Sequence, residues 1–253
     1  MPKFQFKQLA CFLPFNKTVT EDLTGNIEVE IMGGNDGEDY WGDNHHLGLR
    51  KSIYVENDKT LYLQNLNYSI GIYNCLKLKN SENWNFDNQD FTIQCWYKPI
   101  GFMTYVPGNV SHYDSLFASE TDGYLGINNA ENGIRYHIIN AAHNDWHTPW
   151  QSNIKLINNK WYHVAMCRKG TVVYGFLNGV KNYQSDIGTA VINRPREPFY
   201  IGRWGSNAFG GEFCMAEFMV DIGHCWYTDN FTPRTFLNRN IVNNFILSSN
   251  ANT

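Results

Sequence analysis

Residues 143–150, with the sequence His-Asn-Asp-Trp-His-Thr-Pro-Trp, have the side chains of a sugar-binding site. Sugars stack their apolar ring faces on aromatic rings, while Asn, Asp and His side chains bind their hydroxyl groups. Alternatively, the two Trp rings cap an open end of the fold or pack on a neighbouring subunit. The stretch 203–211 adds a second aromatic candidate. The predicted ligand-binding residues are His143, Asp145, Trp146, His147, Trp150 and Trp204.

An acidic stretch predicts a weak candidate for a calcium site. Four carboxylates lie close together in the sequence, at Asp36, Glu38, Asp39 and Asp43. Calcium takes about six to eight oxygen ligands of this kind. The stretch lacks the Asp-x-Asp-x-Asp-Gly pattern of a dedicated calcium loop, so an acidic loop without a metal is the alternative. We expect no other cofactor.

Paired carboxylates that could hydrolyse a glycosidic bond are not evident. A retaining glycosidase needs two carboxyl groups about 5 to 5.5 Å apart, which corresponds to positions i and i+2 on a strand. Glu28 with Glu30 and Glu120 with Asp122 have that spacing, and we interpret both pairs as solvated. Glu212 and Glu217 would face opposite sides of a regular strand. No nucleophile elbow, phosphate loop or dinucleotide fingerprint is present, so we expect no catalysis.

The composition is that of a folded, sparsely charged protein. Of the 253 residues, 17% are charged and 15% are aromatic, too many aromatics for a disordered chain. A net charge of −4 without a basic run argues against a nucleic-acid partner. No apolar run approaches the roughly 20 residues of a membrane span, and no secretory signal is recognisable at the start. The six cysteines show no Cys-x-x-Cys spacing, and we interpret them mainly as core thiols.

Short apolar or alternating runs separated by Gly, Asn and Asp predict an all-β fold with strands enough for two sheets. The pair Asn178-Gly179 predicts a type I′ hairpin turn. The long connections 33–50 and 140–153 are predicted to be functional loops. We expect one domain over 1–232 and an arm or tail over 233–253. The predicted strands are 6–15, 26–32, 60–64, 74–79, 91–99, 115–119, 123–128, 133–139, 161–169, 171–177, 180–184, 198–202 and 213–221.

The order of these elements resembles the laminin G-like, concanavalin A-like jelly-roll family over nearly the whole chain. The resemblance rests on residues 59–63 (Lys-Thr-Leu-Tyr-Leu), 90–99, 161–166 (Trp-Tyr-His-Val-Ala-Met), 175–180, 200–203 and the stretch from 211 to 233. The closing residues 227–233, Tyr-Thr-Asp-Asn-Phe-Thr-Pro, are typical of the branch found in bacteriophage and other viral virion proteins. The resemblance implies a two-sheet antiparallel jelly-roll sandwich.

The resemblance further implies a non-catalytic virion structural or surface protein of the fibre, decoration or minor capsid type. Such a protein would bind other virion proteins, a second copy of itself, or a glycan or host receptor. The fold is also shared by lectins and glycosidases, so its function depends on its sites. A secreted or cell-surface carbohydrate-binding lectin is the alternative, and a glycoside hydrolase ranks below both. We therefore expect a virion location, or otherwise an extracellular one, with no nucleic-acid or membrane partner.

Overall fold

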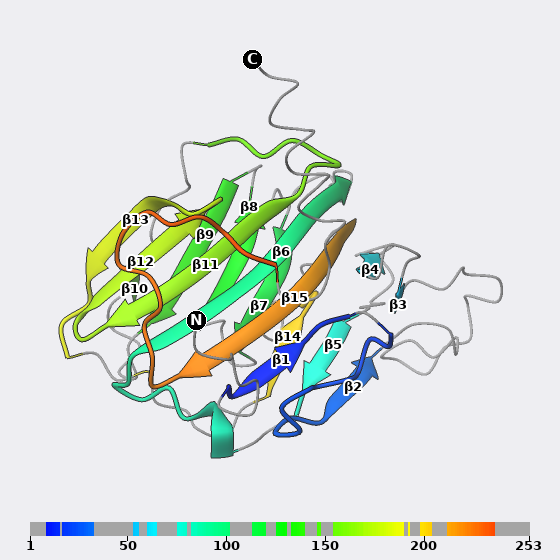
Figure 1. The fold of residues 1–253 in the computed structure, drawn as a ribbon, viewed down its shortest axis with the longest axis horizontal. Helices are drawn as coiled ribbons and strands as arrows, with labels where there is room; N and C mark the ends of the chain where they lie inside the picture. Colours follow the sequence, from blue (N-terminus) through cyan, green and yellow to red (C-terminus); the bar gives the residue numbers. More distant parts are fainter. Residues whose placement is uncertain are drawn as a thin grey trace.

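The structure of the chain is a computed structural model, and two antiparallel sheets form its framework (Figure 1). It describes the residues 9–15, 17–32, 53–55, 60–64, 75–79, 82–101, 113–119, 125–130, 133–139, 146–147, 154–189, 192, 198–203 and 212–235. The first sheet, sheet A, has eight strands, and the second, sheet B, has seven. A single turn of 3-10 helix, Glu82–Trp84, precedes the longest strand of the first half.

Sheet A is arranged around its two longest strands, which lie side by side at its centre. Seven strands follow in the order β13 (Val180–Asp186), β12 (Val172–Leu177), β11 (Tyr162–Lys169), β6 (Phe91–Gly101), β15 (Glu212–Ile222), β4 (Leu61–Gln64) and β3 (Ile53–Val55). The eighth strand, β1 (Cys11–Leu13), pairs with the end of β15 that β4 leaves free. Strand β6 pairs along nearly the whole of β15 on the other side.

Sheet B lies behind sheet A in Figure 1. Its strands follow the order β10 (Trp146–His147), β9 (Gly133–Ile139), β8 (Leu125–Ala130), β7 (Tyr113–Ser119), β14 (Phe199–Ile201), β5 (Cys75–Leu78) and β2 (Val29–Met32). The two outermost strands, β10 and β2, are therefore the edges of this sheet among the described residues. Its strands pair antiparallel throughout.

Side chains from both sheets form one hydrophobic core. On β6, the alternate residues Phe91, Ile93, Cys95 and Tyr97 all belong to it, as the sequence pattern predicts. Val164 and Met166 of β11 also point into the core. Aromatic rings fill its centre, where Phe117 stacks on Phe199 with ring centroids 4.6 Å apart. This core holds the two sheets together, because each sheet alone would expose an apolar face.

All the predicted strands are present, so the prediction of an all-β jelly-roll sandwich is confirmed. Two short strands are not evident in the sequence. The first is β3, and the second is β10, which lies inside the connection 140–153 that is predicted as a loop. A strand of two or three residues is too short to show an alternating pattern. The connection 33–50 lies outside the described residues, and the predicted domain boundary after residue 232 stays a prediction.

Strand β15 is not the regular strand that its sequence predicts. Its register with β6 shifts between Ala216 and Met219, and Glu217 has a φ of +50°. A bulge therefore interrupts the strand there, and the prediction that Glu212 and Glu217 lie on opposite faces of a regular strand does not apply. The predicted turn at Asn178-Gly179 is confirmed, because both residues have positive φ, +52° and +76°.

A buried polar contact ties the two sheets at one end of the core. Asp114 and Asn129 face each other on β7 and β8, and the Tyr97 hydroxyl from sheet A donates to Asp114. The Asn129 side-chain amide donates to the Tyr97 oxygen at 2.8 Å. Burial raises the pKa of Asp114 to about 7, so the folded protein holds this carboxyl group protonated well above its usual range.

The pKa of Asp114 gives a testable dependence of stability on pH. As pH rises above about 4, the unfolded chain loses this proton while the folded chain keeps it until about pH 7. The free energy of unfolding should therefore fall over that interval by at most roughly 4 kcal/mol. Asp114→Asn keeps an acceptor for Tyr97 and removes the titration.

Urea melts from pH 4 to 8 measure this effect as the difference between wild type and Asp114→Asn. The stability of wild type relative to the variant should decline up to about pH 7 and then level off. A difference that does not change with pH would show that Asp114 titrates normally in the folded protein.

Candidate functional site

The predicted ligand-binding segment begins at an edge of sheet B. Trp146 and His147 form strand β10, where they pair with Ile139 and Ile138 of β9. The other predicted ligand residues, His143, Asp145, Trp150 and Trp204, lie outside the described residues, so their prediction stays open. The structure therefore shows that part of this segment borders a sheet edge, where β10 has a described strand on one side only.

The predicted calcium ligands Asp36, Glu38, Asp39 and Asp43 also lie outside the described residues. Within the part of the chain that is described, no three His, Cys, Asp or Glu side chains gather closely enough to hold a metal ion.

The predicted carboxylate pairs show no catalytic arrangement where they are described. Glu28 and Glu30 both lie near Lys79, whose Nζ is 2.6 Å from Glu28 and 4.0 Å from Glu30. Their side chains are 73% and 48% exposed, which confirms their interpretation as solvated carboxylates. Glu120 and Asp122 lie outside the described residues, and Glu212 accepts a hydrogen bond from the Tyr62 hydroxyl.

A segment after the last strand covers the outer face of sheet A. We call residues 223–235 the strap. In Figure 1 the strap is the orange-to-red segment that leaves the end of β15 and crosses the front of β11 and β12. The strap has no strand of its own, and both its side chains and its peptide groups contact sheet A. It lies where an open sheet face would otherwise be available to a ligand.

The outer face of sheet A is apolar enough to need such a cover. Ala165, Cys167 and Phe176 are buried there, and Tyr174, Cys225, Tyr227 and Phe231 pack against them. Beside this cluster, Trp226 packs on Leu9, Phe12 and Met219. The side chains of the strap therefore replace water over these two clusters.

Two stacked aromatic rings form the centre of the cover. Tyr227 and Phe231 stack with ring centroids 3.5 Å apart and an interplanar angle of 6°. Phe231 also meets Phe176 edge-on at 5.3 Å and His163 at 5.6 Å. The Tyr227 hydroxyl donates to the Gln94 side chain at 3.1 Å, so its polar end is satisfied on β6.

The hairpin turn of β12 and β13 anchors one end of the strap. The backbone N–H of Phe231 donates to the carbonyl of Gly179 at 2.9 Å. The Asn230 side chain accepts from the backbone N–H of Lys181 at 2.9 Å, and the Lys181 ammonium donates to the carbonyl of Thr228 at 3.0 Å. A Cβ on Gly179 would lie 1.9 Å from the Phe231 carbonyl oxygen, so only glycine allows this approach.

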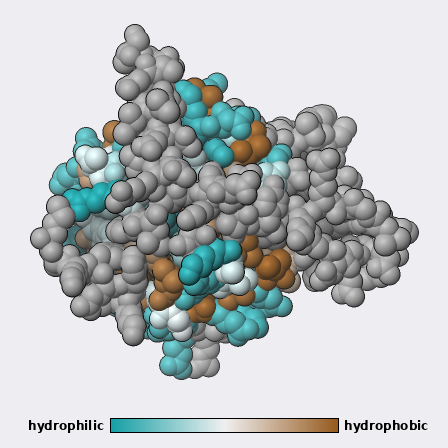
Figure 2. Space-filling model, turned by 45° about the vertical axis from the view of Figure 1, so that its right-hand side comes forward, coloured by the Kyte–Doolittle hydropathy of each residue, from teal (hydrophilic) through white to brown (hydrophobic). Residues whose placement is uncertain are grey.

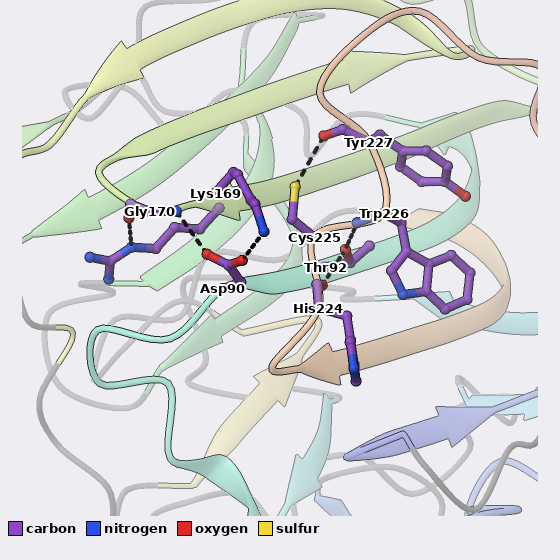
Figure 3. Close-up of polar contacts among 9 residues, drawn as sticks. Asp90, Thr92, Lys169, Gly170, His224, Cys225, Trp226 and Tyr227 are labelled. Atoms are coloured by element: carbon purple, nitrogen blue, oxygen red, sulfur yellow. Dashed lines mark hydrogen bonds and ion pairs between the residues drawn. The ribbon is translucent and has the colours of Figure 1, made fainter.

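Polar groups at the start of the strap anchor its other end (Figure 3). The Thr92 hydroxyl donates to the His224 carbonyl and accepts from the Trp226 backbone N–H, both at 2.9 Å. Asp221, at the end of β15, accepts from the Trp226 indole at 2.6 Å and lies 3.0 Å from the His224 ring. These bonds fix the direction in which the chain turns back over the sheet.

The electrostatics beneath the strap do not suit acid–base chemistry. Burial lowers the pKa of His163 to about 3, so its ring is neutral at physiological pH. Burial likewise raises the pKa of Tyr227, which keeps its hydroxyl protonated. The ring of His163 packs against Trp96 at 5.2 Å and against Phe231, rather than against a carboxylate. Neither His163 nor Tyr227 is therefore poised to transfer a proton near neutral pH.

The strap is only partly visible in the sequence. Residues 227–233 stand out there as the exit from the last strand, but their return over sheet A is not predicted. One feature of the sequence does indicate a cover on the outer face of sheet A. Strand β11 carries buried apolar residues at both odd and even positions, from Val164 to Cys167. Such a strand needs a cover on each face.

Comparison with known proteins agrees with this architecture. The family model described as the concanavalin A-like lectin/glucanases superfamily, a laminin G-like family, matches residues 71–220. No curated protein matches the chain in sequence. Among the helices of the described residues, none is long and apolar enough to cross a membrane. The chain thus belongs to the concanavalin A-like lectin/glucanases superfamily.

Several solved structures share the fold at low sequence identity. The binding domain of botulinum neurotoxin DC, solved in complex with rat synaptotagmin II, superposes with a TM-score of 0.59 and 13% identity over 97% of this chain and 52% of that chain. The binding domain of Paraclostridial Mosquitocidal Protein 1 has a TM-score of 0.52 and 14% identity over 98% and 53%. The present chain spans about half the length of these two toxin chains.

A carbohydrate-associated domain of similar size also matches. It is domain 4 of AbnA, an extracellular arabinanase of Geobacillus stearothermophilus, solved in complex with arabinotriose. Its TM-score is 0.51 and its identity 18%, over 86% of this chain and 94% of that chain. None of these three structures is a virion protein, so the finer resemblance to the viral branch stays a proposal.

Substituting glycines in two turns tests the anchoring of the strap. Gly179→Ala should lower the free energy of unfolding by roughly 2 kcal/mol more than Gly170→Ala. Both glycines have a positive φ, +76° and +59°, so both substitutions impose similar backbone strain. Only at Gly179 would the added Cβ collide with the strap, since nothing lies within 4 Å of the position at Gly170.

Urea denaturation of the two variants and wild type measures the difference. Equal losses in both variants would mean that the Gly179 turn does not support the strap.

Proposed function

We propose that the chain is a non-catalytic binding module of a virion, of the fibre, decoration or minor capsid type. It binds a glycan or a receptor through the segment that begins at the β10 edge of sheet B. The observation that carries this proposal is the closed outer face of sheet A. Because the strap covers the apolar cluster on that face, we place binding at a sheet edge and in the segment that continues from it.

The similar structures support binding rather than catalysis. Two of them are binding domains of toxins, and the third was solved with arabinotriose bound. A hydrolase would need two carboxylates close together on an accessible surface, whereas the predicted pair Glu28 and Glu30 lies beside Lys79. A glycoside hydrolase therefore remains the weakest of the three hypotheses.

The described surface favours a specific site over a broad apolar contact. Its exposed large hydrophobic residues come from four different segments, and Figure 2 shows apolar and hydrophilic residues mixed on one face. These exposed residues are Leu23, Ile31, Ile154, Ile157 and Val180. The partners that we propose are therefore a glycan or receptor first, and virion neighbours or a second copy of the chain next.

The virion assignment and its alternative, a secreted or cell-surface lectin, differ in where the protein is found. Mass spectrometry of purified particles from the encoding virus should detect the chain at a fixed stoichiometry. A gene among host secretory genes, with no trace of the chain in particles, would contradict the virion assignment and favour the lectin.

Substitution of Trp146 tests the binding segment. Trp146→Ala should weaken binding to a glycan identified on an array by about 2 kcal/mol or more, because aromatic anchors dominate such sites. Folding should remain nearly intact. Trp150→Ala should behave in the same way. Binding titrations paired with denaturant melts measure both quantities.

Trp161→Ala is the matched control, because Trp161 is 3% exposed on the outer face of sheet A. This variant should lose about 3 to 5 kcal/mol of stability. If Trp146→Ala instead behaves like Trp161→Ala, its denaturation midpoint falls sharply and binding is not specifically lost. The Trp146 ring then caps the fold, and the proposed ligand site is wrong.

A further inference from the structure

Two cysteines meet where the strap crosses sheet A. Cys167 is fully buried on β11, and Cys225 is a half-buried residue of the strap that packs on the same apolar cluster. The Cys225 thiol donates a hydrogen bond to the Tyr227 carbonyl at 3.4 Å. Both cysteines are free thiols in the structure. The remaining four cysteines are buried, so among the six only Cys225 is partly open to solvent.

The surrounding polar groups hold Cys225 in this position. Thr92 lies opposite Cys167 in the register of β6 and β11, and its hydroxyl is 3.5 Å from the Cys167 sulfur. The same hydroxyl bonds the peptide groups of His224 and Trp226, on either side of Cys225, as Figure 3 shows. One side chain therefore contacts Cys167 and fixes the backbone around Cys225.

We propose that Cys167 and Cys225 form a disulfide when the protein meets a small-molecule disulfide such as oxidised glutathione, and that this bond locks the strap onto sheet A. The inference is independent of the proposed function. It rests on the shared Thr92 contacts, on the packing of Cys225 against Cys167, and on the difference in exposure of the two thiols.

The difference in exposure sets the order of the two exchange steps. The Cys225 thiolate attacks one sulfur of oxidised glutathione, a mixed disulfide forms, and one glutathione leaves and takes up a proton. The Cys167 thiolate then attacks the Cys225 sulfur, and the second glutathione leaves as a thiol. Two protein thiols are oxidised, and one glutathione disulfide is reduced to two thiols.

The acidities of the two thiols fit this order. The neighbouring Cys167 thiol lowers the pKa of Cys225, so the half-buried thiol ionises first. Burial raises the pKa of Cys167 well above its usual range. This thiol therefore reacts second, after Cys225 has formed the mixed disulfide beside it.

The test uses the wild-type chain, folded and reduced, then incubated with oxidised glutathione at neutral pH. Free thiols are blocked with an alkylating reagent, and peptides are analysed by mass spectrometry without reduction. The expected product is one peptide pair joined through Cys167 and Cys225 within a monomer. The oxidised protein should melt at least about 4 °C higher than the reduced protein, because a loop of about 60 residues is closed.

Variants separate the proposed bond from general oxidation. Cys225→Ser should abolish the linked peptide and the rise in melting temperature, while Cys214→Ser, a buried control on the same sheet face, should leave both unchanged. A mixed glutathione disulfide that persists at Cys225, a bond between two chains, or no reaction at Cys225 would each overturn the proposal.

Discussion

The apolar outer face of sheet A is the feature on which the rest of the molecule depends. A β-sandwich normally buries one face of each sheet, yet in this chain Cys167 and Phe176 are buried on the face that points away from the core. An apolar patch of this kind would favour aggregation of a free monomer if it were exposed to water. The strap solves this problem within the chain, and the sandwich gains a third layer.

The strap is held at both ends by elements that the fold already provides. The hairpin turn at Gly179 receives Phe231, and Thr92 with Asp221 receives the first residues of the strap. Between these anchors, the stacked rings of Tyr227 and Phe231 supply the buried area. Residues 227–233 thus have a structural task in this chain.

Sequence alone predicts most of the sandwich, because alternation and turn residues report local geometry. The core face of β6 and the turn at Asn178-Gly179 can be read directly. The return of the strap over sheet A cannot be predicted, since no local sequence pattern shows where a segment without a strand will pack. The bulge at Glu217 escapes prediction for a similar reason, because it depends on the pairing of β15 with β6. For the candidate site, the structure adds the place of Trp146 and His147 at a sheet edge.

Hydrogen exchange of the backbone amides in the strap tests the central claim most directly. If the strap is a layer of the fold, the amides of Trp226 and Phe231, which donate to Thr92 and Gly179, should exchange with protection comparable to that of amides inside β11. Exchange of these two amides at the rate of an unstructured peptide, while β11 stays protected, would show that the outer face of sheet A is open. That result would contradict the role of the strap as a third layer, and the exposed face would become the first place to look for a ligand.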